Sequence, residues 1–388
     1  MIETRFKKTD IGEVPEDWDI KMLGEIAPLQ RGFDLPTSTL QNGVVPVIYS
    51  NGICNFHNRG ICKAPGLVTG RSGTIGKFTF LSSGYYWPHN TTLWVTSFNN
   101  NSPLFIYYLY SFQKIEEFSS GSGVPTLNRN DVHKKRIPVP PFIEQQRIAT
   151  VLSDIDALLS NLNKKVEKKK LIKQGVMQQL LTGEKRLEGF NKPWIEKRLG
   201  DMSTMNSGGT PSSRVQAFYN GGIPFLSISD MTAQGKYIYS TEKKISELGL
   251  INSSARIVNE GTILYAMYAS LGKCSISAIR MAISQAVLGI NVNTAILDNA
   301  FLYYYLSFIE NKVVAMGQTG TQSNLSKELV QNFVLKIPVD LTEQIAIATI
   351  LSDMDAEIEA LETKRTKYEQ VKQGMMQQLL TGKIRLID

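Results

Sequence analysis

Cysteine and long apolar runs are scarce in this chain. Its 388 residues include only three cysteines, which is too few for a disulfide framework and typical of a reducing compartment. No apolar run approaches the roughly 18 residues that a membrane-spanning helix needs, and the opening residues MIETRFKKTD lack the apolar core of a signal peptide. We therefore expect a cytoplasmic protein with no membrane association.

Acidic residues are outnumbered by basic ones. The chain has 42 Lys and Arg against 35 Asp and Glu, a net charge of +7. This favours an anionic partner such as nucleic acid, although many ordinary proteins share such an excess. The densest basic run, at 164–173, indicates a solvated helix face or a protein contact more than direct DNA binding. With 42% hydrophobic residues, the chain is long enough for two or three domains with proper cores.

A duplicated segment organises the sequence. Residues 144–187 align without a gap with residues 343–386, and 25 of the 44 aligned positions are identical. Each copy predicts one long helix, because apolar residues recur at alternating spacings of four and three, the pattern of a coiled-coil seam. The seam residues are Ile148, Leu152, Ile155, Leu159 and Leu162 in the first copy, and Ile347, Leu351, Met354, Ile358 and Leu361 in the second. About 40 residues give a rod of roughly 60 Å.

The ends of both helices carry the expected signals. Asp340 followed by Glu343 has the form of an N-terminal capping box, and Gly183 and Gly382 stand where a helix C-terminus needs glycine. The middle of the seam is polar, with Lys169, Lys173, Arg365, Tyr368 and Lys372 on seam positions. In an antiparallel pair this middle either faces water or is offered to another chain.

Gly175 and Gly374 occupy the same place in the two copies. A glycine inside a helix costs about 1 kcal/mol relative to alanine. Close approach of another backbone and a defect inherited through duplication explain it equally well.

The regions before the two helices predict one shared mixed α/β fold. Short β-branched runs between glycines at 66–68 and 261–264 are typical of strands, and aromatic-rich helices are expected at 102–118 and 299–313. The linker at 182–194 resembles the end of the chain joined to its beginning. We therefore expect the two chain ends to lie near each other in a nearly circular, pseudo-two-fold molecule.

The candidate enzyme and metal-binding motifs lack residues that their chemistry requires. The glycine-rich segment at 70–78 resembles a phosphate-binding loop, but Arg71 and Phe78 replace the required glycine and the Ser or Thr. A structural zinc at Cys54, His57 and Cys62 is disfavoured because no second close pair exists. Asp154 and Asp156, like Asp353 and Asp355, point in different directions at a spacing of two on a helix, so a polar face or a partner contact is expected.

The repeated motifs resemble the specificity subunit of type I restriction-modification systems. The resemblance spans essentially the whole chain and rests on PPFIEQQRIATVLSDIDA, KQGVMQQLLTG and their second copies, with looser matches at RSGTIGK and SGGTPS. It implies an α+β fold in which two target recognition domains are joined by two long antiparallel helices. The implied domains are residues 1–140 and 184–340, and the implied conserved helices are residues 141–183 and 341–388.

The resemblance also implies function and partners. Each recognition domain reads one half of a split site in double-stranded DNA, and the seam residues set the domain separation and dock methyltransferase subunits, two per chain. Restriction and motor subunits join through that complex. The chain itself is then non-catalytic. No adenine-methyltransferase tetrad is present, because Val139-Pro140-Pro141-Phe142 lacks the required amide or acid. S-adenosylmethionine, ATP and Mg are expected only on the partners. The alternative is a stand-alone bipartite DNA-binding regulator, which would not co-purify with a methyltransferase.

DNA-contacting residues are chosen by chemistry. Arg and Lys suit guanine, Asn and Gln suit adenine, and small hydroxyls suit phosphates. In the first domain the candidates are Arg31, Arg71, Lys77, His89, Asn90, Asn128 and Arg129. In the second they are Thr210, Ser212, Arg214, Tyr268, Lys273, Gln285, Gln322 and Asn324. An ordinary surface or turn role is as good an explanation for any single one, so they are predicted as a set. No catalytic residue and no metal ligand is predicted.

Overall fold

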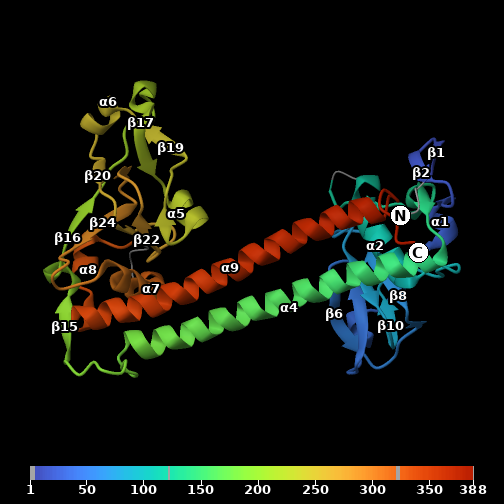
Figure 1. The fold of residues 1–388 in the computed structure, drawn as a ribbon, viewed down its shortest axis with the longest axis horizontal. Helices are drawn as coiled ribbons and strands as arrows, with labels where there is room; N and C mark the ends of the chain where they lie inside the picture. Colours follow the sequence, from blue (N-terminus) through green and yellow to red (C-terminus); the bar gives the residue numbers. More distant parts are fainter. Residues whose placement is uncertain (1–4, 121–122, 320–323, 388) are drawn as a thin grey trace. The chain divides into compact units, whose positions relative to one another are not determined.

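The computed structural model describes residues 5–120, 123–319 and 324–387. The chain forms two compact units: unit 1 comprises Met1–Lys164 with Glu362–Asp388, and unit 2 comprises Lys165–Leu361. The long helices α4 (Phe142–Leu181) and α9 (Leu341–Leu379) therefore contribute residues to both units (Figure 1). The predicted pair of long helices is confirmed.

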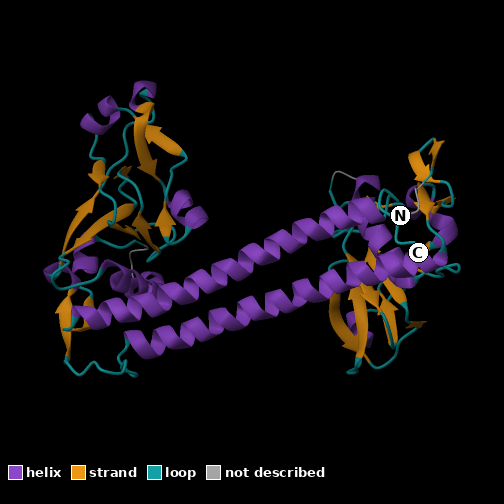
Figure 2. Ribbon diagram, viewed as in Figure 1, coloured by secondary structure: helices purple, strands orange, loops and turns teal. Residues whose placement is uncertain are grey.

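Unit 1 contains two four-stranded sheets (Figure 2). The first has the order β4 (Leu29–Arg31), β11 (Thr92–Val95), β8 (Gly66–Gly70) and β9 (Phe78–Leu81), with every neighbouring pair antiparallel. The second has the order β6 (Gly52–His57), β5 (Val45–Tyr49), β10 (Tyr85–Pro88) and β7 (Cys62–Lys63), with β5 and β10 parallel. A ribbon of β3 (Asp19–Met22) and β14 (Arg136–Val139) leads to the long helix.

Unit 2 repeats this topology. Its first sheet runs β16 (Ser203–Ser207), β24 (Val287–Val292), β21 (Ile263–Ala266), β22 (Cys274–Ser277) and β18 (Tyr237–Ile238). Its second runs β19 (Lys243–Ile245), β17 (Tyr219–Leu226), β23 (Met281–Ile283) and β20 (Arg256–Val258), with β17 and β23 parallel. The ribbon is β15 (Trp194–Arg198) with β25 (Val334–Pro338). The shared mixed fold is confirmed, and β18 is an addition to the first sheet of unit 2.

Smaller elements complete each unit. In unit 1 these are β1 (Phe6–Thr9), β2 (Gly12–Pro15), α1 (Leu23–Ile26), η1 (Thr37–Thr39), α2 (Pro103–Phe112), η2 (Ile115–Phe118), β12 (Ser119–Ser120), β13 (Thr126–Leu127) and α3 (Arg129–His133). In unit 2 they are η3 (Leu199–Asp201), η4 (Gln216–Phe218), α5 (Ile228–Gln234), α6 (Glu247–Ile251), α7 (Asn299–Thr319) and α8 (Lys327–Gln331). The expected aromatic-rich helices are α2 and α7, and Ser102 caps α2 with Pro103 in its first turn.

Each unit has a core to which both long helices contribute. In unit 1, Ile148 and Leu152 at the start of α4 share a buried cluster with Leu379 at the end of α9. In unit 2, Leu351 at the start of α9 shares one with Leu180 at the end of α4. The two helices are therefore antiparallel within each unit, as predicted.

The predicted seam is buried most completely where it meets a recognition domain. The fully buried members are Ile148, Leu152, Leu162, Ile347, Leu351 and Ile358, and the half-buried ones are Ile155, Leu159, Met354 and Leu361. The polar middle pairs between the helices: Lys169 lies 2.7 Å from Glu357, and Lys173 forms an ion pair with Asp355. These ion pairs account for both lysines, so neither exposure to water alone nor a contact with another chain is needed to explain them.

One prediction at the helices is wrong, and one of the two alternatives for the helix glycines is excluded within the chain. Asp340 accepts from the backbone N–H of Thr342 at 3.1 Å, while the side chain of Glu343 is turned toward Arg186, so no capping box forms. The buried carboxylate of Glu343 binds a guanidinium instead of the cap backbone because a charge-assisted bond is stronger. No heavy atom lies within 4 Å of a side chain built at Gly175 or Gly374, so neither glycine serves packing within the chain. The C-terminal glycines Gly183 and Gly382 have φ of +74° each, as predicted.

The two ends of the chain meet in unit 1. Arg385 donates to Glu144 and to Asp17 at 2.6–2.8 Å, and the backbone N–H of Leu386 donates to Glu144 at 3.1 Å. In unit 2 the continuous linker makes the same bond, with Arg186 donating to Glu343 at 2.6 and 2.7 Å. The chain end and the chain start thus take the place of the linker, as the sequence comparison predicted.

Candidate DNA-recognition site

Most candidates in unit 1 lie at one edge of the sheet β4-β11-β8-β9. Arg31 ends β4, Asn90 precedes β11 and Arg71 follows β8, and the antiparallel pairing of these strands brings their ends together. The loops are bonded to one another: the Arg71 N–H donates to the Thr91 carbonyl at 2.8 Å. The guanidinium of Arg31 donates to the Asn90 carbonyl at 3.4 Å. The structure therefore gathers these three residues on connected loops.

Asn128 and Arg129 join the same edge through α3. The Arg71 carbonyl accepts from the Leu127 N–H at 2.8 Å, which holds the start of α3 beside the β8 loop. Asn128 is the N-cap of α3, and its side-chain oxygen accepts from the Asn130 N–H at 3.0 Å. This bond gives Asn128 a structural role. Arg129 is exposed and donates to the Leu29 carbonyl at 3.5 Å.

Lys77 and His89 are linked through the segment that follows β5. The ammonium of Lys77 donates to the Asn51 carbonyl at 3.1 Å, and the ring of His89 lies 4.4 Å from the ring of Tyr49. The Nδ1 atom of His89 accepts from the Thr91 N–H at 3.4 Å. Burial lowers the pKa of His89, against a smaller opposing effect of Asp34. The imidazole is thus neutral near pH 7 and shapes its loop instead of attracting phosphate by charge.

The candidates of unit 2 form an equivalent edge. The Met267 N–H donates to the Ala286 carbonyl at 2.9 Å, and the Leu325 N–H donates to the Met267 carbonyl at 3.1 Å. These bonds bring together the loops that carry Tyr268, Gln285 and Asn324. Thr210 reaches the same place, because its hydroxyl donates to Gln285 Oε1 at 2.5 Å. All four side chains are exposed.

The other candidates of unit 2 are less closely placed. Ser212 and Arg214 are exposed on the loop after Thr210, where the Ser212 carbonyl accepts from the Val215 N–H at 3.2 Å. The charge of Lys273 opposes the rise that burial causes in the pKa of Glu310 on α7, and the lysine itself is half-buried. Gln322 lies outside the described residues.

The joint between each recognition domain and the long helices was missed in the sequence. In unit 1, Tyr108 of α2 donates to Asp156 at 2.8 Å, and Lys372 lies 2.6 Å from Asp156. The same trio recurs in unit 2 as Tyr304, Asp355 and Lys173. Identity of these Asp and Lys residues between the copies was the available signal. Asp154 and Asp353 are exposed, so the aspartates of each pair do point apart.

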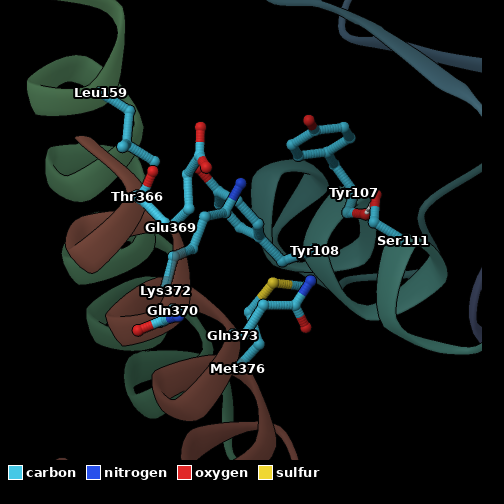
Figure 3. Close-up of a pocket in the computed structure, with 10 residues that line it drawn as sticks. All are labelled: Tyr107, Tyr108, Ser111, Leu159, Thr366, Glu369, Gln370, Lys372, Gln373 and Met376. Atoms are coloured by element: carbon cyan, nitrogen blue, oxygen red, sulfur yellow. Dashed lines mark hydrogen bonds between the residues drawn. The ribbon is translucent and has the colours of Figure 1, made fainter. Parts of the chain in front are cut away.

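A groove adjoins the joint of unit 1. Figure 3 shows Tyr107 and Tyr108 from α2, Leu159 from α4 and Lys372 from α9 around it. Its volume is about 740 Å³. It therefore exposes aromatic and apolar surface where the recognition domain meets both helices.

Metal and membrane features are absent from the part of the chain that the structure describes. Cys54 is exposed and Cys62 is buried, and the described residues include no group of three or more His, Cys, Asp or Glu placed to hold a metal ion. Within the same residues no helix is long and apolar enough to cross a membrane.

These features define a protein with two topologically equal domains, each presenting polar loops at a sheet edge and each fixed to the same pair of helices. The domain family described as "Type I restriction modification DNA specificity domain" matches residues 15–173 and 191–373. The chain belongs to this family, and its function is DNA specificity in a type I restriction-modification system. The predicted resemblance and the predicted non-catalytic role agree with this membership.

Relatives and solved structures agree along nearly the whole chain. A putative type I restriction enzyme MjaX specificity subunit of Methanocaldococcus jannaschii is 27% identical over 428 residues, covering 99% of this chain and 97% of the relative. The MjaIX specificity subunit of the same organism is 26% identical, covering 87% and 86%. The crystal structure of a type I S subunit from M. genitalium has a TM-score of 0.64 at 15% identity, covering 98% and 99%, and shows the shared fold.

Proposed function

We propose that this chain reads an asymmetric, bipartite site in double-stranded DNA, with one half-site for each unit. The observation that carries the proposal is that loops at equivalent positions in the two units have different side chains. The loop before β11 carries His89, Asn90 and Thr91, whereas the loop before β24 carries Ser284, Gln285 and Ala286. Identical domains would read a palindrome. Domains that share a topology but present different groups favour two unlike half-sites.

We further propose that the helices dock two methyltransferase subunits, through which restriction and motor subunits join. Among positions of the helices that are exposed in both copies, identity is concentrated on one face. Spacings of four and three separate the early members, and spacings of three and seven, which is two helical turns, separate the later ones. Six of the eight exposed identical pairs lie on this face, namely Thr150 and Thr349, Asp154 and Asp353, Ala157 and Ala356, Lys165 and Lys364, Lys168 and Lys367, and Gly175 and Gly374. The other two, Gln174 with Gln373 and Gln178 with Gln377, lie beside it.

Internal packing does not account for these identities, since the side chains are exposed. Most exposed pairs on other faces have diverged, for example Lys170 against Glu369 and Leu171 against Gln370. Each unit contains one full set, with the early members from one helix and the late members from the other. Two equal sets favour one partner type bound twice.

The partners then supply the chemistry. S-adenosylmethionine would bind the methyltransferase subunits, and ATP and Mg would bind the motor subunit, in line with a chain that reads and does not modify DNA. We propose a cytoplasmic location, where host DNA and these partners are found.

A domain exchange tests this function. Residues 23–135 are replaced by those of a related domain that keeps a tyrosine at position 108, so that the β3-β14 ribbon and the bond to Asp156 are preserved. Modified bases are mapped genome-wide in cells expressing the chimera with its methyltransferase. We expect one half-site to change while the other half-site stays the same. A continuous or palindromic motif, or a change in both halves, would refute the proposal.

A further inference from the structure

One side-chain hydrogen bond occupies the same place in both units, but the carboxamide in it is the donor in unit 1 and the acceptor in unit 2. In unit 1 Arg31 pairs with Leu93 across β4 and β11, and in unit 2 Ser207 pairs with Leu288 across β16 and β24. Three residues beyond each paired position, the first strand reaches Asp34 in unit 1 and Thr210 in unit 2. Three residues before Leu93 the chain has Asn90, and three residues before Leu288 it has Gln285, so a carboxamide precedes the second strand in both units.

The loops that carry these carboxamides have the same backbone turn. The Thr92 N–H donates to the His89 carbonyl at 2.9 Å, and the Val287 N–H donates to the Ser284 carbonyl at 3.2 Å. Asn90 of unit 1 and Gln285 of unit 2 are therefore equivalent positions. Both lie at the edge where the candidate recognition loops gather.

The bond that orients each carboxamide has opposite polarity. In unit 1, Nδ2 of Asn90 donates to the carboxylate of Asp34. An ionised carboxylate only accepts, so the amide nitrogen must face Asp34 and the carbonyl oxygen Oδ1 is turned away from it. In unit 2, the hydroxyl of Thr210 donates to Oε1 of Gln285 at 2.5 Å. This bond occupies the carbonyl and leaves the two N–H groups of Nε2 directed elsewhere.

The free ends of both carboxamides are available to DNA. No residue that the structure describes hydrogen-bonds to Oδ1 of Asn90 or to Nε2 of Gln285. Asp34, Thr210 and Gln285 are exposed, and Asn90 is half-buried. A base edge in the major groove can thus reach either group.

We propose that these two contacts decide whether each carboxamide offers the DNA base a hydrogen-bond acceptor or hydrogen-bond donors. On the basis of the proposed function, Asn90 presents a hydrogen-bond acceptor and selects a base that offers a donor, the amino group of adenine or cytosine. Gln285 presents donors and selects a base acceptor, such as N7 or O6 of guanine or O4 of thymine. Asp34 and Thr210 are positioning residues that act through the carboxamides. Thr210, chosen from sequence as a DNA contact, takes this indirect role.

Exchanging the positioning residues tests the inference. Asp34→Thr introduces the orienting hydroxyl of unit 2, and Thr210→Asp introduces the carboxylate of unit 1. Each variant is expressed with its methyltransferase, and the methylated motif is mapped. We expect each variant to change base preference at a single position of one half-site, by about 5- to 150-fold, the range for one good base contact. The other half-site stays unchanged.

Matched variants show whether the effect passes through the carboxamide. Asn90→Ala and Gln285→Ala should relax discrimination at the same single positions that Asp34→Thr and Thr210→Asp alter. Thr210→Val removes the donor at nearly constant volume and should relax that position too. Where Asp34→Thr fails to fold, the isosteric Asp34→Asn replaces it, because an amide at position 34 no longer forces Asn90 to donate.

The outcomes separate this inference from the proposed function. Absence of a bipartite motif with the unaltered chain would overturn both. A wild-type bipartite motif that no variant at position 34 or 210 changes, or a uniform loss at all positions of a half-site, would overturn the polarity inference alone.

Discussion

The two units fix their recognition domains to the long helices in the same way, yet unit 2 adds one cation. Both use a tyrosine, an aspartate and a lysine. In unit 2, Lys236 also donates to the Tyr304 hydroxyl at 2.8 Å and to Ser352 at 2.9 Å. It precedes β18, which is the fifth strand of the first sheet of unit 2, whereas the described residues of unit 1 form four strands in the equivalent sheet. Both units thus share the same joint, and unit 2 has one additional support there.

The units also differ in the chain segment that supplies the arginine bound to the buried glutamate. Arg385, at the chain end, holds the buried Glu144 and Asp17 in unit 1. In unit 2, Arg186 holds Glu343 from within a continuous linker and also donates to the Lys192 carbonyl at 2.8 Å. The bond from Arg385 to Asp17 therefore joins the two ends of the sequence in unit 1, whereas the bond from Arg186 to Lys192 lies within a continuous linker in unit 2.

The largest expected effect comes from removing these arginines. Arg385→Ala leaves Glu144 buried without its cation and should destabilise unit 1 by about 3–5 kcal/mol. Arg186→Ala should cost unit 2 less, about 1–3 kcal/mol, because its side chain is 31% exposed against 5% for Arg385. Hydrogen exchange of the β3-β14 and β15-β25 ribbons under mild denaturant measures each unit separately. Equal losses in the two units would show that the greater exposure of Arg186 does not reduce the cost of its removal.

A smaller effect is expected at the joint. Lys236→Met keeps much of the aliphatic stem and removes the two hydrogen bonds, so it should destabilise the attachment of unit 2 by about 1–2 kcal/mol. The cost stays low because burial already lowers the pKa of Lys236 and disfavours its charge. Exchange of amides around Tyr304 reports the loss. Tyr108→Phe and Tyr304→Phe serve as the matched pair, and a larger loss for Tyr108→Phe would contradict an added support in unit 2.

The smallest effect is a pH dependence that is stronger in unit 1, which contains all three histidines of the chain. Burial lowers the pKa of His89 and of His133, and His133 Nε2 accepts from the Leu29 N–H at 2.8 Å. The folded unit favours the neutral forms, so their stabilisation is complete above about pH 6.5 and is lost as the pH falls.

Each histidine contributes at most about 1.4 kcal/mol per pH unit. Exchange protection of unit 1 should therefore decrease between about pH 6.5 and 5, while unit 2 responds less. His133→Gln keeps an acceptor for Leu29 and should weaken the dependence. An equal response of the two units would show that the histidines are not its source.

Much of this architecture is predictable from the sequence because the duplication repeats its signals. The apolar spacing predicted both long helices, and Gly183 and Gly382 marked their ends. The shared topology followed from matching glycines and β-branched runs. The capping box at Asp340 was wrong, because a local motif carries no information about a competing cation 157 residues away from Glu343.

The recognition edge was predictable only in part. Residue chemistry selected Asn90 and Gln285, which the structure places at equivalent positions. Asp34 was missed, because its bond to Asn90 spans 56 residues and depends on strand register. Lys273 was chosen as a lysine that suits guanine, yet its charge also acts on Glu310 of α7, whose pKa it lowers against the effect of burial. Which base each candidate contacts stays a prediction.

The discontinuity of unit 1 has a consequence for biosynthesis. Unit 2 is one uninterrupted segment, Lys165–Leu361, whereas unit 1 requires Glu362–Asp388 to complete its core. On the ribosome the first domain emerges first, yet its buried Trp18 and Glu144 lack their partner until Arg385 is translated, 241 residues after Glu144. At about 5–20 residues per second, that wait lasts on the order of ten to several tens of seconds. The domain that is made first is therefore the last to be finished, and a nascent chain that is released early yields a closed second domain beside an open first one.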